Sequence, residues 1–171
     1  VLGIFFSQVG TPLLRVLSAF DSNAKELGKL LKVDAAWTSQ HFEEIRTILG
    51  NHPLQIDLLK GDLVTLKTLQ AKQRDFLVRL LENPNLLEHE TLTELLWAVF
   101  HLADELEHRS NLATLTDADR EHLAGDIHRA HGLLVVGWLQ HIHHLKTDYP
   151  YLFSLAVRTN PFDPEARVEV E

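Results

Sequence analysis

Apolar residues recur at intervals of three and four along most of this chain, which is the spacing of one face of an α-helix. Between Leu13 and Leu31 the apolar positions step alternately by four and three. We therefore expect residues 1–32 to form one apolar helix that is kinked at Pro12. The polar run Asp21-Ser22-Asn23 favours an alternative, in which this helix is broken in two.

Further helices are expected wherever the same spacing continues between capping and breaking residues. They are predicted at residues 34–49, 54–81, 89–109 and 116–147, with a short last helix at 150–159. Long helices joined by short turns pack antiparallel to their neighbours. The sequence therefore predicts an all-α fold, an up-and-down antiparallel bundle of five main helices and a short C-terminal one. The bundle proper occupies residues 33–159, and residues 160–171 form a frayed acidic tail.

Three polar residues interrupt the apolar stripes of the predicted helices. Gln70 and Gln73 occupy positions in the buried seam of their helix. Such amides either bind a polar ligand in the core or fix the register of neighbouring helices. His131 lies between Ile127 and Leu134, and we expect it to be partly buried and hydrogen-bonded.

The charge balance limits the classes of partner. A formal net charge of −8 argues against nonspecific binding to nucleic acid. With no cysteine, the chain forms no disulfide and no thiolate metal site. Protonation of all eleven histidines would change the net charge from −8 to −8 + 11 = +3. We therefore expect stability or association state to change between about pH 7 and pH 5.5.

Eight of the eleven histidines lie between positions 101 and 144, on two helices expected to form a hairpin. His101, Glu105 and His108 share one flank of the first helix, beside its buried face. His122 and Asp126 share the corresponding flank of the second helix. Because the two helices run antiparallel, Glu105 should lie close to His122, and His101 close to Asp126.

This set of imidazoles and carboxylates suits zinc, iron or manganese, which implies a sensor or oxidase role. Glu105 and His108 also form a Glu-x-x-His motif, although di-iron bundles use two such motifs. The alternative is a solvated flank with weak Glu–His pairs and no cofactor.

Motifs for catalysis are missing from the sequence. It has no phosphate-binding glycine loop, no Gly-x-Ser-x-Gly and no His-Glu-x-x-His. The sequence therefore favours a non-catalytic interaction or oligomerisation domain that self-associates through its apolar helices. A third possibility is a small apolar ligand held between the last two long helices, where Trp97 and Trp138 would line a pocket.

The first twenty residues are strongly apolar, but only about 14 precede Arg15, and a membrane span needs about 20. The segment YPYLFSLAVRTNPFD (residues 149–163) resembles the C-terminal tail of uncharacterised prokaryotic proteins that carry an N-terminal membrane segment. The resemblance implies that Val1–Phe20 is the exit end of a membrane helix, with a tether upstream of Val1. The remainder would then be a cytoplasmic helical bundle.

Overall fold

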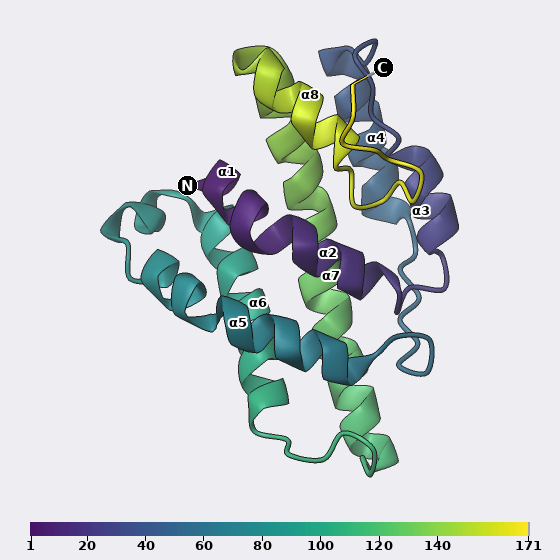
Figure 1. Cartoon of the computed structure of the whole chain (residues 1–171), viewed down its shortest axis with the longest axis vertical. Coiled ribbons are helices and arrows are strands. Elements are labelled where there is room, and N and C mark those ends of the chain that lie inside the picture. The colour runs from purple at the N-terminus through teal and green to yellow at the C-terminus, as the bar shows by residue number, and fades with distance from the viewer. Residues whose placement is uncertain (171) are drawn as a thin grey trace.

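A computed structural model describes residues 1–170 of the chain (Figure 1). Its elements are α1 (Leu2–Phe5), the π-helical segment η1 (Phe6–Gly10), α2 (Thr11–Ser18), α3 (Ala24–Leu30), α4 (Ser39–Asn51), α5 (Leu63–Leu81), the 3₁₀ segment η2 (Pro84–Glu88), α6 (Glu90–Glu107), α7 (Asp117–Asp148) and α8 (Pro150–Arg158). The predicted all-α class is confirmed. Among the described residues, extended pairing is limited to an isolated antiparallel bridge between Asp21 and Ile56.

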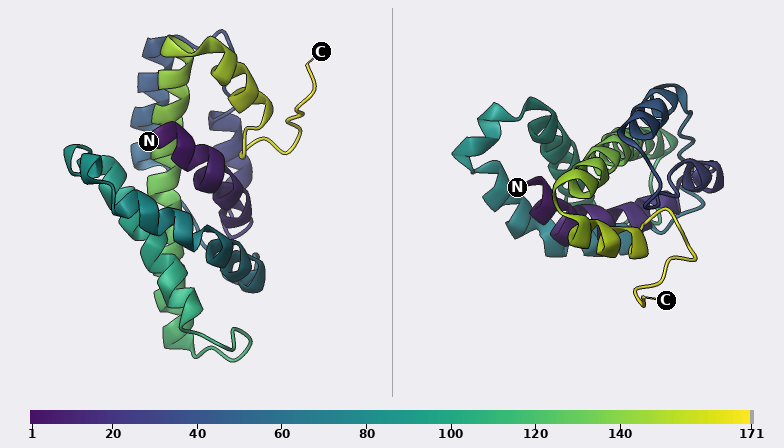
Figure 2. Two further views of the ribbon diagram at one scale, coloured as in Figure 1. Left: turned by 60° about the vertical axis from the view of Figure 1, so that its left-hand side comes forward. Right: turned by 90° about the horizontal axis from the view of Figure 1, so that it is seen from above.

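The long helix α7 is the axis of the molecule (Figures 1 and 2). Helix α6 packs against its first half as the other arm of an antiparallel hairpin, and α4 and α8 pack against its second half. Helices α2 and α5 contact each other and lie across the hairpin. Helices α2, α4, α5 and α8 therefore each pack directly against α6 or α7.

Local sequence signals fix both ends of α7. The Thr116 hydroxyl accepts a hydrogen bond from the Asp119 backbone N–H at 3.1 Å, which caps the helix at its predicted start. Two acidic residues in the first turn, Asp117 and Asp119, interact favourably with the positive end of the helix dipole. At the other end Pro150 starts α8, because proline is tolerated in the first turn of a helix.

The expected single helix over residues 1–32 is wrong, and the alternative break at the polar run is what forms. The segment is π-helical before Pro12, which has no N–H to continue the regular pattern. Helix α2 then ends at Ser18. The Asp21 carboxylate accepts hydrogen bonds from the backbone N–H of Asn23 (2.9 Å) and Gln55 (3.1 Å), which competes with helical hydrogen bonding.

The apolar face of this N-terminal segment is buried in the chain's own core. The side chains of Phe6, Val9, Leu13 and Leu17 are no more than 1% exposed. They pack in one cluster with residues of α5, α6 and α7. Among the described residues, no helix combines the length and the apolar character that a membrane crossing requires.

Helices α4 and α5 begin later than predicted, because other residues cap them. The Thr38 hydroxyl accepts from a backbone N–H of the first turn of α4, while Asp34 instead accepts from the N–H of Ala36 in the preceding turn. Helix α5 begins at Leu63, after Asp62, whose carboxylate accepts two backbone hydrogen bonds.

Residues 52–62 form a loop against the connection between α2 and α3, although residues 54–62 were predicted as the start of that helix. The Ser22 N–H donates to the Gln55 carbonyl at 2.8 Å, and the Asp57 N–H donates to the Phe20 carbonyl at 2.8 Å. As a result Leu59, which falls within the predicted helix 54–81, is 85% exposed.

Two buried amides join α5 to its neighbours. Gln70 donates from Nε2 to the Val99 carbonyl of α6 at 3.1 Å, and Gln73 donates to the Val9 carbonyl of η1 at 3.3 Å. Both side chains are buried, as predicted. Because each amide binds backbone of a neighbouring segment, this geometry agrees with the register-fixing alternative.

The beginning of the C-terminal tail is packed, and the expectation of fraying fails there. Asn160 donates from Nδ2 to the Leu31 carbonyl at 2.9 Å. The Phe162 ring is buried and lies 5.0 Å from the Trp138 ring. Residues 164–170 are mostly exposed, and Glu171, the last residue of the predicted tail, lies outside the described residues.

His131 is fully buried, and the expected hydrogen bond is not found. Among the described residues, neither ring nitrogen has a hydrogen-bond partner. Its Nε2 lies 3.9 Å from Asp21 Oδ2, which is too far for one. Burial lowers the pKa of His131 to about 4, against the opposing charge of Asp21.

We expect the free energy of unfolding to fall as the pH is lowered from about 6.5 to about 4. The unfolded chain binds a proton at His131 near its ordinary pKa, whereas the folded chain resists protonation until about pH 4. Urea denaturation at several pH values in this range should show that the free energy of unfolding changes less with pH in His131→Leu than in the wild type. An equal change of unfolding free energy with pH in the two proteins would contradict this origin of the pH dependence.

The burial of the N-terminal segment is tested by truncating Leu13, which is fully buried. Leu13→Ala should lower the free energy of unfolding by about 2–5 kcal/mol. The matched control Ile4→Ala, at a position that is 59% exposed, should change it by less than about 0.5 kcal/mol. Similar effects of the two substitutions would show that the segment is not part of the core.

Candidate metal centre

Four of the predicted ligands meet on one side of the α6–α7 hairpin. His101 and Glu105 of α6 and His122 and Asp126 of α7 each contribute one ligand atom, and all four atoms lie within 4.8 Å of one another. His122 Nε2 is 3.2 Å from Glu105 Oε1, and His101 Nε2 is 3.5 Å from Asp126 Oδ2. These are the two cross-helix neighbours expected from the sequence.

The spacing within each helix completes a ring of alternating nitrogen and oxygen atoms. His101 Nε2 lies 3.4 Å from Glu105 Oε1, and His122 Nε2 lies 3.3 Å from Asp126 Oδ2. Around a tetrahedral ion with bonds of about 2.0–2.1 Å, ligand atoms stand about 3.3–3.4 Å apart. Four of the six atom pairs therefore have the separation that one small cation requires.

Each carboxylate of the centre is oriented by an arginine that binds its other oxygen. Arg109 Nη1 donates to Glu105 Oε2 at 2.6 Å, and Arg129 Nη1 donates to Asp126 Oδ1 at 3.0 Å. The oxygens left over, Oε1 and Oδ2, are the ones that face the two histidines. Such outer contacts hold metal ligands in place before an ion binds.

Arg109 also ties the centre to the start of α7. Its Nε donates to Asp119 Oδ2 at 2.8 Å and its Nη2 to Asp119 Oδ1 at 2.5 Å, which is a bidentate pair. The hydrogen bond from Arg109 lowers the pKa of Glu105, with a further contribution from His122. The same guanidinium lowers the pKa of Asp119. Both carboxylates are therefore ionised at neutral pH.

Asp126 is the most buried group of the centre. Its side chain is 5% exposed, and Oδ2 has no hydrogen-bond partner among the described residues. A buried carboxylate oxygen without a partner destabilises the fold unless a positive charge lies beside it. His101 and His122 are about half exposed, so the centre opens to solvent on one side.

His108, also predicted as a ligand, is not brought into the group. It caps the C-terminal end of α6, and its ring is 75% exposed. Its Nδ1 lies 2.8 Å from the Asp104 carbonyl oxygen and 3.9 Å from Asp104 Oδ1.

The sequence reasoning also missed the two arginines that orient the carboxylates. Their spacing was a usable signal, since Arg109 is four residues after Glu105 and Arg129 three after Asp126.

The two tryptophans proposed to line a ligand pocket lie in different surroundings. Trp97 is 55% exposed, with its ring 5.8 Å from that of Phe100. Trp138 is buried against Phe162. An apolar ligand between α6 and α7 that contacts both rings is therefore not supported.

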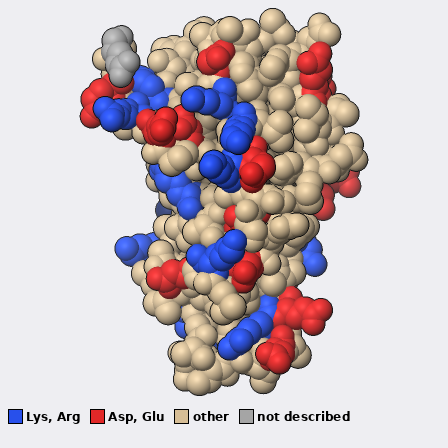
Figure 3. Space-filling model, turned by 90° about the vertical axis from the view of Figure 1, so that its right-hand side faces the viewer, with Lys and Arg blue, Asp and Glu red and all other residues tan. Residues whose placement is uncertain are grey.

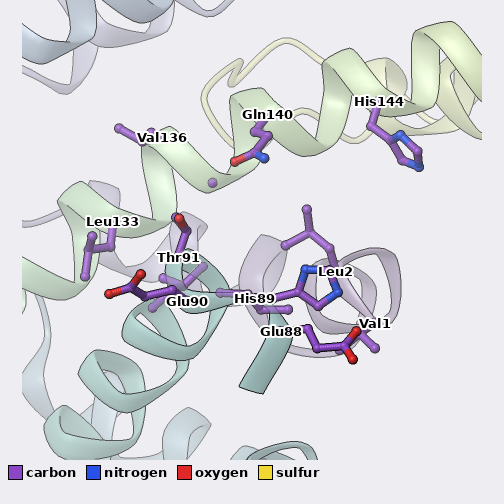
Figure 4. Close-up of a pocket in the computed structure, with 13 residues that line it drawn as sticks. Val1, Leu2, Glu88, His89, Glu90, Thr91, Leu133, Val136, Gln140 and His144 are labelled. Atoms are coloured by element: carbon purple, nitrogen blue, oxygen red, sulfur yellow. The ribbon is translucent and has the colours of Figure 1, made fainter. Parts of the chain in front are cut away.

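A cavity of about 560 Å³ lies elsewhere, between α1, the start of α6 and the second half of α7 (Figure 4). Glu88 and His89 come from one wall, and Gln140 and His144 come from the other (Figure 4). The polar groups on the two walls do not converge on a common point. This cavity therefore lacks the arrangement of groups that distinguishes the hairpin centre.

Acidic and basic side chains are interspersed over the face drawn in Figure 3. No broad patch of one sign covers this face. The charge pattern here resembles an ordinary solvated surface.

The geometry defines an all-helical domain with a surface cluster of two histidines and two carboxylates. The chain belongs to the family of the C-terminal helical domain of the uncharacterized protein MJ1433, which matches residues 1–158. The chain is 46% identical over 163 residues to uncharacterized protein MJ1433 of Methanocaldococcus jannaschii. The matched region covers 95% of this chain and 65% of that relative. No solved structure matches the chain.

The resemblance inferred from the tail is thus confirmed as far as an uncharacterised helical family. The family match includes the first part of the tail segment, residues 149–158. Neither the membrane segment that the resemblance implied nor the tail motif on which it was based has support from these matches.

Removal of the Arg109 guanidinium should destabilise the protein at pH 7 more than at low pH. Glu105 and Asp119 have lowered pKa values in the folded state, so their contribution exists above their ordinary pKa and is lost as the pH falls through the folded values. The difference in unfolding free energy between wild type and Arg109→Gln should therefore shrink between pH 7 and pH 3. A difference that is constant with pH would contradict this role of Arg109.

Proposed function

We propose that this domain binds one divalent transition-metal ion, such as zinc, manganese or iron, at the α6–α7 hairpin. Two imidazole nitrogens and two carboxylate oxygens form a mixed ligand set that suits borderline cations. The observation that carries the proposal is the buried Asp126 Oδ2, which has no hydrogen bond to any described residue and lies close to the other three ligand atoms. A bound cation would give this oxygen a partner, in addition to the ion pair that Arg129 makes with Oδ1.

The ligand set fits a single ion better than a pair. Di-iron bundles use six carboxylate and histidine residues from four helices, and the group here has four residues from two helices. A sensor or structural role is therefore favoured over an oxidase of the di-iron type. Ligands from both arms of the hairpin would make metal binding stabilise the packing of α6 on α7.

Metal titration of the tag-free protein tests this proposal. Calorimetry with zinc or manganese should give one equivalent bound, and saturation should raise the melting temperature. Asp126→Asn removes a charged ligand and should weaken binding by at least about tenfold, since even outer contacts of metal sites contribute this much. His108→Gln is the matched control, because His108 lies beside the centre but outside the group, and it should bind like the wild type.

Binding that His108→Gln weakens as strongly as Asp126→Asn would place the ion elsewhere. An absence of binding by the wild type at millimolar zinc and manganese would contradict the proposal.

A non-catalytic interaction domain is the second candidate. Its expected contact surface, the apolar face of residues 1–32, is occupied by the chain's own core. What supports this candidate is the exposure of two tyrosines at the start of α8, since Tyr149, just before the helix, is 44% exposed and Tyr151 is 72% exposed. A concentration-dependent dimer in light scattering that Tyr151→Ser abolishes would support self-association. A protein that stays monomeric at all concentrations would contradict self-association.

A further inference from the structure

A groove separate from the metal centre runs between the N-terminal segment and α8, with the second half of α7 as its floor. Its volume is about 510 Å³. This size is typical of small-molecule sites. Ile4 and Phe6 line one wall, Leu152 and Leu155 line the other, and Trp138 and Leu145 lie in the floor. The groove therefore joins segments from opposite ends of the chain.

The apolar walls of the groove are open to water. Ile4 is 59%, Leu152 40% and Leu155 45% exposed. A contiguous apolar surface that remains exposed marks a binding site more often than scattered single residues do. Burial of these side chains by a ligand would provide a hydrophobic gain in binding free energy.

The charge that lines the groove is positive. Of the described residues that line it, Arg15 carries the one charged side chain and none is Asp or Glu. Arg15 Nη2 donates to the Thr159 carbonyl at 2.8 Å, which holds the guanidinium between α2 and α8. The described residues show no carboxylate paired with this guanidinium. Its remaining N–H groups are suited to bind a planar anion.

His141 adds a polar group without adding a positive charge. Its ring is 7% exposed and stacks on Phe6, with ring centroids 5.1 Å apart and planes within 8°. Burial lowers the pKa of His141 to about 4, with a smaller contribution from His144. The imidazole is therefore neutral at pH 7, and Arg15 alone selects the charge of the ligand.

We propose that this groove binds a small amphipathic carboxylate. The apolar tail lies over Trp138 between the walls formed by α1 and α8, and the carboxylate binds the Arg15 guanidinium. This site is independent of the metal centre, since none of the four metal ligands lines the groove.

The test uses decanoate as the anionic probe and decylamine as its cationic counterpart of the same length. Calorimetric titration of the full chain is done below the micelle concentration and with chelator present, so that metal binding does not interfere. Decanoate should bind at one site and shift the Trp138 indole signal in NMR spectra, and decylamine should not. Arg15→Gln should weaken decanoate binding by about tenfold to a hundredfold, as expected for loss of a hydrogen bond to a charged group.

A second variant places a negative charge in the wall. Leu155→Glu should abolish decanoate binding by repulsion, and folding should be retained because position 155 is 45% exposed. Leu59→Glu, at a position that is 85% exposed and outside the groove, is the matched control and should bind like the wild type.

Several outcomes would overturn the proposal. These are equal binding of decylamine and decanoate, unchanged affinity in Arg15→Gln, and no decanoate binding by the wild type. A dimer that Leu155→Glu dissociates would also overturn it, since the groove would then be a contact between two copies of the chain.

Discussion

The packing of α6 against α7 fixes the position of the buried Asp126 carboxylate. The candidate metal centre depends on that position. Arg129 binds one oxygen of this carboxylate, and the other faces His101, Glu105 and His122. Because the helices are antiparallel, later residues of α6 lie beside earlier residues of α7, as in the pairs Glu105–His122 and His101–Asp126. A shift of one turn, about 5.4 Å, between the two helices would separate the ligand atoms beyond the reach of one ion. The packing of the hairpin and the chemistry of the centre are thus one constraint.

Helix α7 carries two different surfaces along its length. Its first half holds the candidate metal ligands His122 and Asp126, and its second half forms the floor of the apolar groove at Trp138 and Leu145. Asp126 and Trp138 are 12 positions apart, which corresponds to about 18 Å along the helix axis. The N-terminal segment packs across the middle of the helix and forms one wall of the groove. One rigid helix therefore fixes the separation of the two candidate sites.

The hairpin and four of its five proposed ligands were predictable, because regular apolar spacing set the phase of both helices and Thr116 marks the start of the second. Glu105 and Asp126 follow their histidines by four residues, which places each pair on one helix face. His108 falls outside the group because α6 ends at Glu107. The break after Ser18 was visible only as an alternative, since periodicity does not show that Asp21 binds backbone groups of residues 23 and 55.

Features that join distant parts of the chain were not predictable. The start of α5 moved to Leu63 because residues 52–62 pair with the α2–α3 connection. The groove combines residues 3–15 with residues 138–159, and sequence spacing alone does not bring them together. His131 was expected to be hydrogen-bonded, but local pattern says nothing of the partners that tertiary packing provides.

The most direct measurement of the central claim is anomalous diffraction from crystals of the tag-free protein grown with one equivalent of zinc. We expect one strong anomalous peak about 2.0–2.2 Å from ligand atoms of His101, Glu105, His122 and Asp126. A peak at another group of histidines, with Asp126 Oδ2 left without a cation, would contradict the account.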